Sequence, residues 1–191
     1  MQEDIRAAKQ HADVVVMSIH WGIRLVPKTI ATYQPPVAHA AIDAGADLIL
    51  GHHAHVPKAV EVYKGKACFY SIGNFLIHGS LRKPFEWNLI WFPVDPECFP
   101  PHGKYHFPSQ CRNTMIAKAV FSKEGVKRIS FLPAYINSKA QPAVITPGES
   151  KFKEMLDYME WVSDDHPHKF RVDGSEIVVD TSEQAHSNCH R

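Results

Sequence analysis

The sequence predicts an α/β fold with a mixed sheet, and three observations carry this prediction. Residues 13–19 and 47–50 are short apolar runs typical of strands buried on both faces, and residues 33–44 between them have a helical pattern. A strand, a helix and a strand in this order predict a right-handed βαβ unit with parallel pairing. Two later pairs of apolar runs predict antiparallel hairpins, which make the sheet mixed.

Composition sets broad limits on the kind of protein. The 191 residues are 45 % hydrophobic and 21 % charged, values typical of one globular domain with a full core. A formal net charge of +1 gives no reason to expect a nucleic-acid partner or an anionic membrane surface. No run approaches the ~20 apolar residues of a membrane span, and the N-terminus does not have the pattern of a signal peptide.

The predicted βαβ unit begins after a short helix. Residues 3–12 have the pattern of a helix end, with Ile5 and Ala8 on one face. Pro35 and Pro36 are tolerable only in the first turn of the helix at 33–44. Gly45 is a plausible C-terminal cap for that helix.

The remaining elements follow in four segments. Residues 59–63 and 66–72 predict a hairpin with Lys64-Gly65 in the turn, and residues 76–112 are an irregular insertion around one strand at 87–94. A second hairpin (115–121 and 126–133), an amphipathic helix (151–162) and a last strand (176–180) complete the prediction. The chain therefore divides into a metal-site half at 1–75, the insertion at 76–112, a C-terminal part of the same domain at 113–181 and a disordered tail at 182–191.

The four cysteines do not form a C-x-x-C pair. Cys68 lies in an apolar run, which favours a small buried residue. Cys98 and Cys111 flank a Pro-rich loop and either remain thiols or form a bridge in an oxidising compartment.

The strongest chemical signal is Gly51-His52-His53-Ala54-His55, directly after a predicted buried strand. In extended backbone, residues two apart point to the same face, so His53 and His55 are expected to reach one region while His52 points away. In open α/β sheets, ligands bind beyond the C-terminal ends of the strands, where this segment lies.

His20 ends the neighbouring predicted strand, so three imidazoles are expected within reach of a common centre. Neutral imidazole binds Zn, Mn, Fe, Cu and Ni, which makes His20, His53 and His55 candidate metal ligands. The alternative is that each of them is an ordinary solvated or hydrogen-bonded strand-end side chain.

A second signal is Ser71-Ile72-Gly73-Asn74 at the end of another predicted strand. Asn74 is expected either to orient a water or hydrogen-bond a metal-bound oxygen, or simply to cap the turn. Gly73 suggests a backbone position with positive φ or a close approach. Ser71 lacks the G-x-S-x-G turn that exposes a nucleophilic serine.

Three stretches, ADVVVMSIHWG, AAIDAGADLILGHHAHV and VEVYKGKACFYSIGNF, resemble in order the CapA-like poly-γ-glutamate capsule-synthesis (PGA_cap) family. That family belongs to the calcineurin-like metallophosphoesterase superfamily. The resemblance is strong over residues 3–77 and weaker but consistent through the hairpin at 115–133 and the helix at 151–163. It implies that this chain corresponds to the C-terminal half of a four-layer α/β/β/α sandwich.

The resemblance also implies roles for particular residues. His20 matches the ligand of the family's H-W-G motif, and His53 and His55 match the ligand pair of G-x-H-x-H. Asn74 lies in the G-N-F segment that closes the site, and Asn74 and His52 are expected to be secondary catalytic residues. The implied cofactor is a divalent transition metal (Mn, Zn or Fe), two ions in the intact fold, whose activated water hydrolyses a phosphoester or related bond.

This sequence departs from the family pattern in one respect. The acidic ligands of the family's N-terminal half precede the point where this chain begins, and Asp13, Asp43, Asp47 and Glu61 are not placed to replace them. We therefore expect weak metal binding and no activity from the chain alone, with the N-terminal half supplied by sequence upstream of Met1 or by another chain.

Three interpretations remain open from the sequence. The chain is part of a metal-dependent hydrolase acting on a small-molecule or polymer substrate such as poly-γ-glutamate, or it is a non-catalytic capsule-polymer binding or assembly component. The third is an inactive truncated fragment, from a misassigned start or a split gene. By family analogy alone, the expected location is the cell envelope or the extracellular space.

Overall fold

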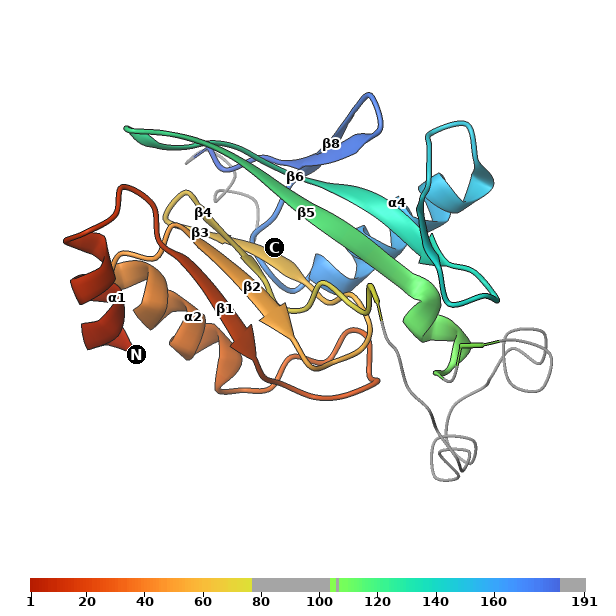
Figure 1. Ribbon diagram of the computed structural model, residues 1–191, viewed down its shortest axis with the longest axis horizontal. Helices are drawn as coiled ribbons and strands as arrows, with labels where there is room; N and C mark the ends of the chain where they lie inside the picture. Colours follow the sequence, from red (N-terminus) through yellow and green to blue (C-terminus); the bar gives the residue numbers. More distant parts are fainter. Residues whose placement is uncertain (77–103, 106, 183–191) are drawn as a thin grey trace.

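The computed structural model describes residues 1–76, 104–105 and 107–182 (Figure 1). The first sheet and its helices comprise α1 (Gln2–Lys9), β1 (Val16–His20), α2 (Gln34–Asp43), β2 (Leu48–His52), β3 (Val60–Tyr63) and β4 (Lys66–Phe69). The remaining elements are the 3₁₀ helix η1 (Ser109–Arg112), β5 (Asn113–Ser122), β6 (Gly125–Ile136), β7 (Pro142–Val144), α4 (Ser150–Ser163), β8 (Phe170–Asp173) and β9 (Glu176–Val179).

The first sheet has the strand order β1-β2-β4-β3, with β1, β2 and β4 parallel and β3 antiparallel to β4. The predicted βαβ unit and the mixed α/β character are therefore confirmed. The second sheet is antiparallel, in the order β5-β6-β9-β8, and β7 pairs with β6. Because β1, β2 and β4 run in one direction, their C-terminal ends meet at the same edge of the first sheet.

Local signals for turns and caps are confirmed. Pro35 and Pro36 occupy the first turn of α2, and Gly45 has φ of +116° just after that helix. Lys64 and Gly65 both have positive φ, at +48° and +71°, as a two-residue hairpin turn requires. The Lys64-Gly65 turn therefore joins β3 to β4 as predicted.

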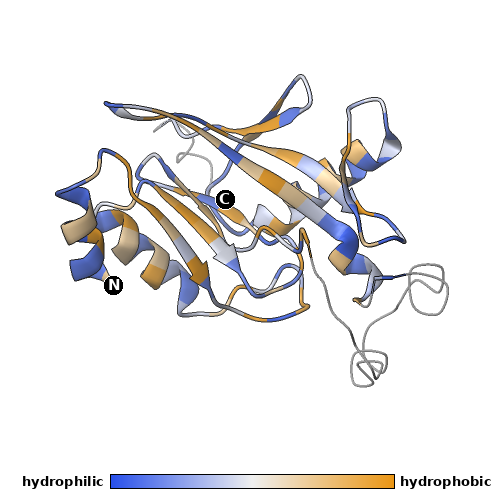
Figure 2. Cartoon of the chain, in the orientation of Figure 1, coloured by the Kyte–Doolittle hydropathy of each residue, from blue (hydrophilic) through white to orange (hydrophobic). Residues whose placement is uncertain are grey.

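Two hydrophobic cores lie on the two faces of the first sheet. The larger lies between the two sheets and α4, and includes Phe69, Phe131 and Met159. The smaller packs α1 and α2 against the other face, through residues such as Ala38, Ile49 and Tyr70. Figure 2 shows orange apolar segments along the strands where the sheets face each other and blue segments on α1.

The prediction that both faces of the first strand are buried is wrong. β1 is an edge strand, its residues alternate between exposed and half-buried, and Val16 is 44 % exposed. Met17 and Ile19 pack towards the helices, whereas Val16, Ser18 and His20 face outward. An apolar run shows that a strand can be buried on both faces. It does not show whether other strands or helices cover those faces.

Two strands were not predicted. β7 has three residues and β8 (Phe-Arg-Val-Asp) has four, of which two are polar, so neither run is long enough to give a strong strand pattern. The predicted strand at 87–94, most of the insertion and all but one residue of the predicted tail lie outside the described residues. Of the insertion, the described residues 104–105 and 107–112 lead into β5 through η1.

Cys68 and Cys111 are buried free thiols, while Cys98 and Cys189 lie outside the described residues. Burial raises the pKa of Cys111 to about 12, which keeps this thiol protonated at neutral pH. No helix in the described ranges is long and apolar enough to cross a membrane.

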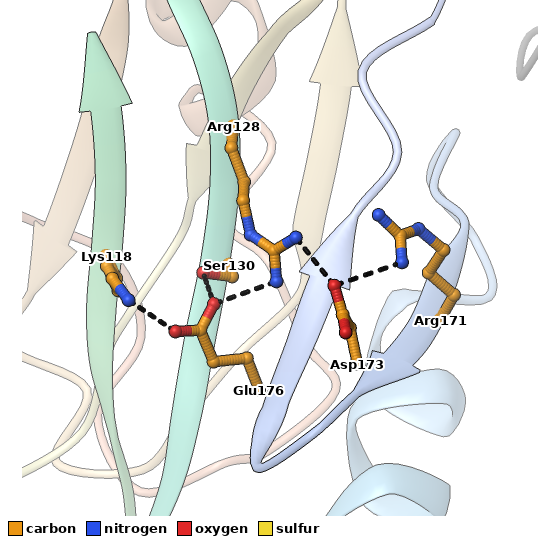
Figure 3. A network of polar contacts seen from close by, with 6 residues as sticks. All are labelled: Lys118, Arg128, Ser130, Arg171, Asp173 and Glu176. Atoms are coloured by element: carbon orange, nitrogen blue, oxygen red, sulfur yellow. Dashed lines mark hydrogen bonds and ion pairs between the residues drawn. The ribbon is translucent and has the colours of Figure 1, made fainter.

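A polar network occupies the face of the second sheet that is turned away from the core, and Figure 3 draws its members Lys118, Arg128, Ser130, Arg171, Asp173 and Glu176. Glu176 accepts hydrogen bonds from Lys118, from Ser130 at 2.8 Å and from Arg128 at 3.0 Å. The Lys118 and Ser130 hydrogen bonds, with a smaller contribution from Arg128, lower the pKa of Glu176 to about 2. The carboxylate therefore remains ionised well into the acid range.

This network predicts an acid-dependent loss of stability. The folded-state pKa of Glu176 is lower than its unfolded value, so its stabilising effect is present at neutral pH and is lost as pH falls from about 4 to about 2. Glu176→Gln should lower the free energy of unfolding at pH 7 and have a much smaller effect near pH 2. Urea unfolding at several pH values measures this, with Glu154→Gln, exposed on α4, as the control. A difference from wild type that does not change with pH would contradict the prediction.

Candidate metal centre

The candidate site lies where the C-terminal ends of β1, β2 and β4 meet. His20 is the last residue of β1 and pairs in register with His52, the last residue of β2. Asn74 follows β4 after a short connection in which Ile72 donates its N–H to the carbonyl of Gly51 at 3.1 Å. The parallel strands thus bring residues from three parts of the sequence to one edge, as ligand sites in α/β sheets require.

His20 and His53 are in direct contact. The Nε2 atom of His20 lies 2.8 Å from Nδ1 of His53, and the two ring centroids are 4.6 Å apart at an interplanar angle of 66°. Two ring nitrogens at this distance share one proton or direct their lone pairs at one point between them. The structure therefore places these two predicted site residues side by side.

The expectation that extended backbone would direct His53 and His55 to one region was wrong, because residues 53–55 are not extended. β2 ends at His52, and His53 and His55 have φ of +91° and +61°. Positive φ is costly for residues other than glycine and is concentrated at functional sites. The turn, rather than strand alternation, sets the directions of these side chains.

His55 lies deeper than His53 and contacts a different set of groups. Its Nδ1 is 2.7 Å from Oδ1 of Asn74, and its ring is 4.7 Å, centroid to centroid, from the ring of Phe107. The ring centroids of His53 and His55 are 6.4 Å apart. His55 therefore lies beside the His20–His53 pair and forms its hydrogen bond with Asn74.

His52 and Asn74 differ in how they relate to the cluster. The Nε2 atom of His52 lies 3.0 Å from Oγ of Ser18, on β1. Asn74 is 5 % exposed and is bonded to His55 and to the hydroxyl of Tyr105, at 2.9 Å. The structure thus brings Asn74 into contact with His55, while the hydrogen bond of His52 is directed back along the sheet to Ser18.

The electrostatic surroundings favour neutral imidazoles. Burial, with the charges of His20, Arg24 and Lys58, lowers the pKa of His53, and burial is also the main cause that lowers the pKa of His55. Burial together with His20 lowers the pKa of His52. The neutral ring is the form that binds metal ions, and no carboxylate is among the charges acting on these three described histidines.

Two loops that carry the site are tied to each other. Leu25 donates its N–H to the carbonyl of Ala54 at 2.9 Å, between His53 and His55. Lys58 is 1 % exposed and donates from Nζ to the carbonyl of Thr29 at 2.5 Å, and burial lowers its pKa to about 8. These bonds hold residues 53–58, called the histidine loop below, against the loop that follows β1.

The donor atoms at this site are of a type that binds transition metals, but fewer of them converge than such an ion needs. Two imidazole nitrogens converge at 2.8 Å and a third imidazole is adjacent. Within the described part of the chain, no set of three His, Cys, Asp or Glu side chains is close enough to hold an ion. The nearest acidic residues along the sequence are engaged elsewhere: Asp43 with Lys64, Asp47 with Lys9 and Lys66, and Glu61 with His39.

Sequence reasoning missed four residues of the site: Arg24, Lys58, Tyr105 and Phe107. Tyr105 and Phe107 belong to the insertion, in which the sequence favours a surface role for His102 and His106 over the lining of a substrate path. His102 and His106 lie outside the described residues. A sequence signal for Tyr105 and Phe107 was the spacing in Tyr105-His106-Phe107. In extended backbone, residues two apart point to the same side, which would bring the two rings together.

Comparisons with known proteins agree with this region of the chain. Residues 1–78 match the family described as bacterial capsule synthesis protein PGA_cap. The chain is 49 % identical over 88 residues to "PGA biosynthesis protein CapA" of Bacillus subtilis (strain 168), a stretch that is 46 % of this chain and 23 % of that protein. It is 47 % identical over 84 residues to "Capsule biosynthesis protein CapA" of Bacillus anthracis, which is 44 % of this chain and 20 % of that protein.

A more distant match is a "Probable polyglutamine synthesis accessory protein" of Mycobacterium tuberculosis (strain CDC 1551 / Oshkosh). It is 37 % identical over 100 residues, which is 48 % of this chain and 26 % of that protein. In all three comparisons the matched stretch spans about a quarter or less of the relative's length.

Proposed function

We propose that this chain, whose residues 1–78 match the PGA_cap capsule synthesis family and are similar to CapA proteins, supplies half of a metal-dependent hydrolytic centre of the metallophosphoesterase type. The reaction class is hydrolysis of a phosphoester or a related bond in capsule biosynthesis. The observation that supports it most is the 2.8 Å approach of His20 Nε2 and His53 Nδ1 at the C-terminal edge of parallel strands.

In this proposal His20, His53 and His55 hold a divalent transition metal such as Mn, Zn or Fe. Such an ion acts as a Lewis acid and lowers the pKa of water. Asn74 orients His55, and the lowered pKa values of His53 and His55 keep their rings available as ligands at neutral pH. Arg24 and Lys58 add positive charge beside His53, which favours an anionic substrate.

We further propose that carboxylate ligands come from outside the residues described here. The outer edge of β1 forms no strand pair within the described ranges, and Val16 on its exposed face is 44 % exposed. An additional strand there would extend the first sheet beside His20. This addition would give the four-layer sandwich of which the α1–α2 layer and the two sheets are the described parts.

The test is metal-dependent turnover of a chromogenic phosphodiester by the metal-stripped chain and by the complete product of its gene, with Mn or Zn added. We expect turnover from a form that contains the missing carboxylates, little from the 191 residues alone, and none after chelation. Absence of metal-dependent turnover from every form would contradict the proposal.

Calorimetry should show weak zinc binding by the 191 residues. Stoichiometric submicromolar binding would contradict the proposal that part of the ligand set comes from outside the described residues.

A second candidate is a non-catalytic role in the binding or assembly of a capsule polymer such as poly-γ-glutamate. It is favoured by the word "accessory" in the name of the mycobacterial relative. The same experiment separates the two candidates, since a binding component would retain polymer without metal-dependent turnover. In either case we propose that the protein acts at the cell envelope or outside the cell.

A further inference from the structure

A line of hydrogen bonds connects His55 to a backbone carbonyl in the insertion. Nδ1 of His55 is 2.7 Å from Oδ1 of Asn74, Nδ2 of Asn74 is 2.9 Å from the hydroxyl of Tyr105, and that hydroxyl contacts the carbonyl oxygen of Cys111. Asn74 and Tyr105 are 5 % and 3 % exposed, so water has little access to compete for these bonds. The carbonyl oxygen at the end of this line has a fixed role, and it sets the direction of each bond before it.

The fixed end is the carbonyl of Cys111, which can only accept. Two oxygen atoms at hydrogen-bonding distance need a proton between them, and only the phenol of Tyr105 carries one. Burial raises the pKa of Tyr105 above its usual value, so the phenol keeps that proton. The hydroxyl of Tyr105 therefore donates to Cys111 and has only lone pairs left for Asn74.

This direction fixes the side-chain amide of Asn74. A hydroxyl that can only accept must face the NH₂ group, which is the orientation with Nδ2 towards Tyr105. Oδ1 of Asn74 then faces His55 and can only accept, so Nδ1 of His55 must carry the proton. With the proton on Nδ1, the lone pair of the neutral ring is on Nε2.

We propose that Tyr105 is a positioning residue that, through Asn74, holds His55 in the Nδ1–H tautomer and leaves Nε2 free as a metal ligand. The tautomer follows from the hydrogen bonds alone, whereas the use of Nε2 as a ligand rests on the proposed function. Metal-bound histidines characteristically donate their other ring N–H to a fixed acceptor, which orients the ring and sets the tautomer. Phe107 packs against the same ring and supports its orientation.

The experiment is long-range ¹H–¹⁵N correlation NMR on the histidine-labelled, metal-free chain, at a pH where His55 is neutral. In the wild-type chain we expect Nδ1 to appear as the protonated nitrogen and Nε2 as the unprotonated one. Tyr105→Phe removes the group that orients Asn74, so a mixture of the two tautomers is expected. Tyr158→Phe is the matched control, because its hydroxyl donates to the carbonyl of Pro57 and does not touch Asn74.

A rescue variant separates positioning from general structural damage. A carboxylate can only accept, so Tyr105→Phe combined with Asn74→Asp should restore a single Nδ1–H tautomer without the tyrosine hydroxyl. A wild-type chain with the proton on Nε2 of His55 would overturn the proposal, whether or not any variant folds. So would an unchanged tautomer in a folded Tyr105→Phe chain.

The ligand role of Nε2 has a separate readout. Tyr105→Phe should weaken zinc or manganese binding by about 10-fold or more, as loss of a group that orients a ligand does. If the tautomer behaves as expected but the metal affinity of the chain is unchanged by Tyr105→Phe, the proposal fails for the metal and holds for the ring. If no form of the protein turns over a phosphodiester, the proposed function fails while the tautomer assignment stands.

Discussion

Replacing His53 with alanine in the complete gene product is expected to lower metal-dependent turnover by about 10³-fold or more, equivalent to about 4 kcal/mol of transition-state stabilisation. His53 is the residue whose Nδ1 lies 2.8 Å from Nε2 of His20, so its removal leaves one imidazole where two converge. The loss should appear in both kcat and metal affinity, because the same nitrogen would serve both. Steady-state kinetics over a series of manganese concentrations measures the two together.

His11→Ala is the control for the loss of a histidine as such. His11 is exposed just after α1 and belongs to no part of the candidate site. Its activity should match that of the wild type. A His53→Ala protein that is folded and keeps more than about a tenth of wild-type turnover at saturating metal would show that His53 is not a ligand.

Replacing Gly51 with alanine should destabilise the fold by about 3 kcal/mol, at the upper end for overpacking. An added Cβ at Gly51 would lie 2.2 Å from the carbonyl oxygen of Tyr70 and 2.5 Å from Nε1 of Trp21. The Tyr70 oxygen is a backbone atom, and it accepts a hydrogen bond from Trp21 Nε1 at 3.0 Å. Because the added Cβ clashes with both atoms, moving either one away would strain this bond. Because Gly51 lies just before the histidine loop, the same change should displace His53.

Urea unfolding measures this effect, and Gly148→Ala is the matched control. A Cβ at Gly148 meets no atom within 4 Å, so that variant should stay within about 0.5 kcal/mol of the wild type. A Gly51→Ala protein within about 1 kcal/mol of the wild type would contradict the tight contact between β2 and the segment after β4.

The parts of the fold that could be predicted are those encoded by neighbouring residues. The βαβ unit, the Lys64-Gly65 turn and α4 follow from local periodicity and turn chemistry, and all are present. The prediction of a fully buried β1 failed because burial depends on the other strands of the sheet. β8 was missed because it has only four residues, two of them polar, and its pairing with β9 stabilises it.

The candidate site could be predicted at the level of its location. Strand ends at the same edge of a parallel sheet must come together, and His20, His53 and Asn74 do lie there. The positive φ values of His53 and His55 and the contact of Tyr105 with Asn74 could not be predicted. They depend on a turn without a glycine and on a segment 31 residues away in the chain.

The most direct test of the central claim is anomalous X-ray diffraction from crystals of this protein soaked in manganese or zinc. We expect an anomalous peak about 2.0–2.2 Å from both His20 Nε2 and His53 Nδ1. A metal bound only at other histidines, or none at these two nitrogens at millimolar metal, would contradict it.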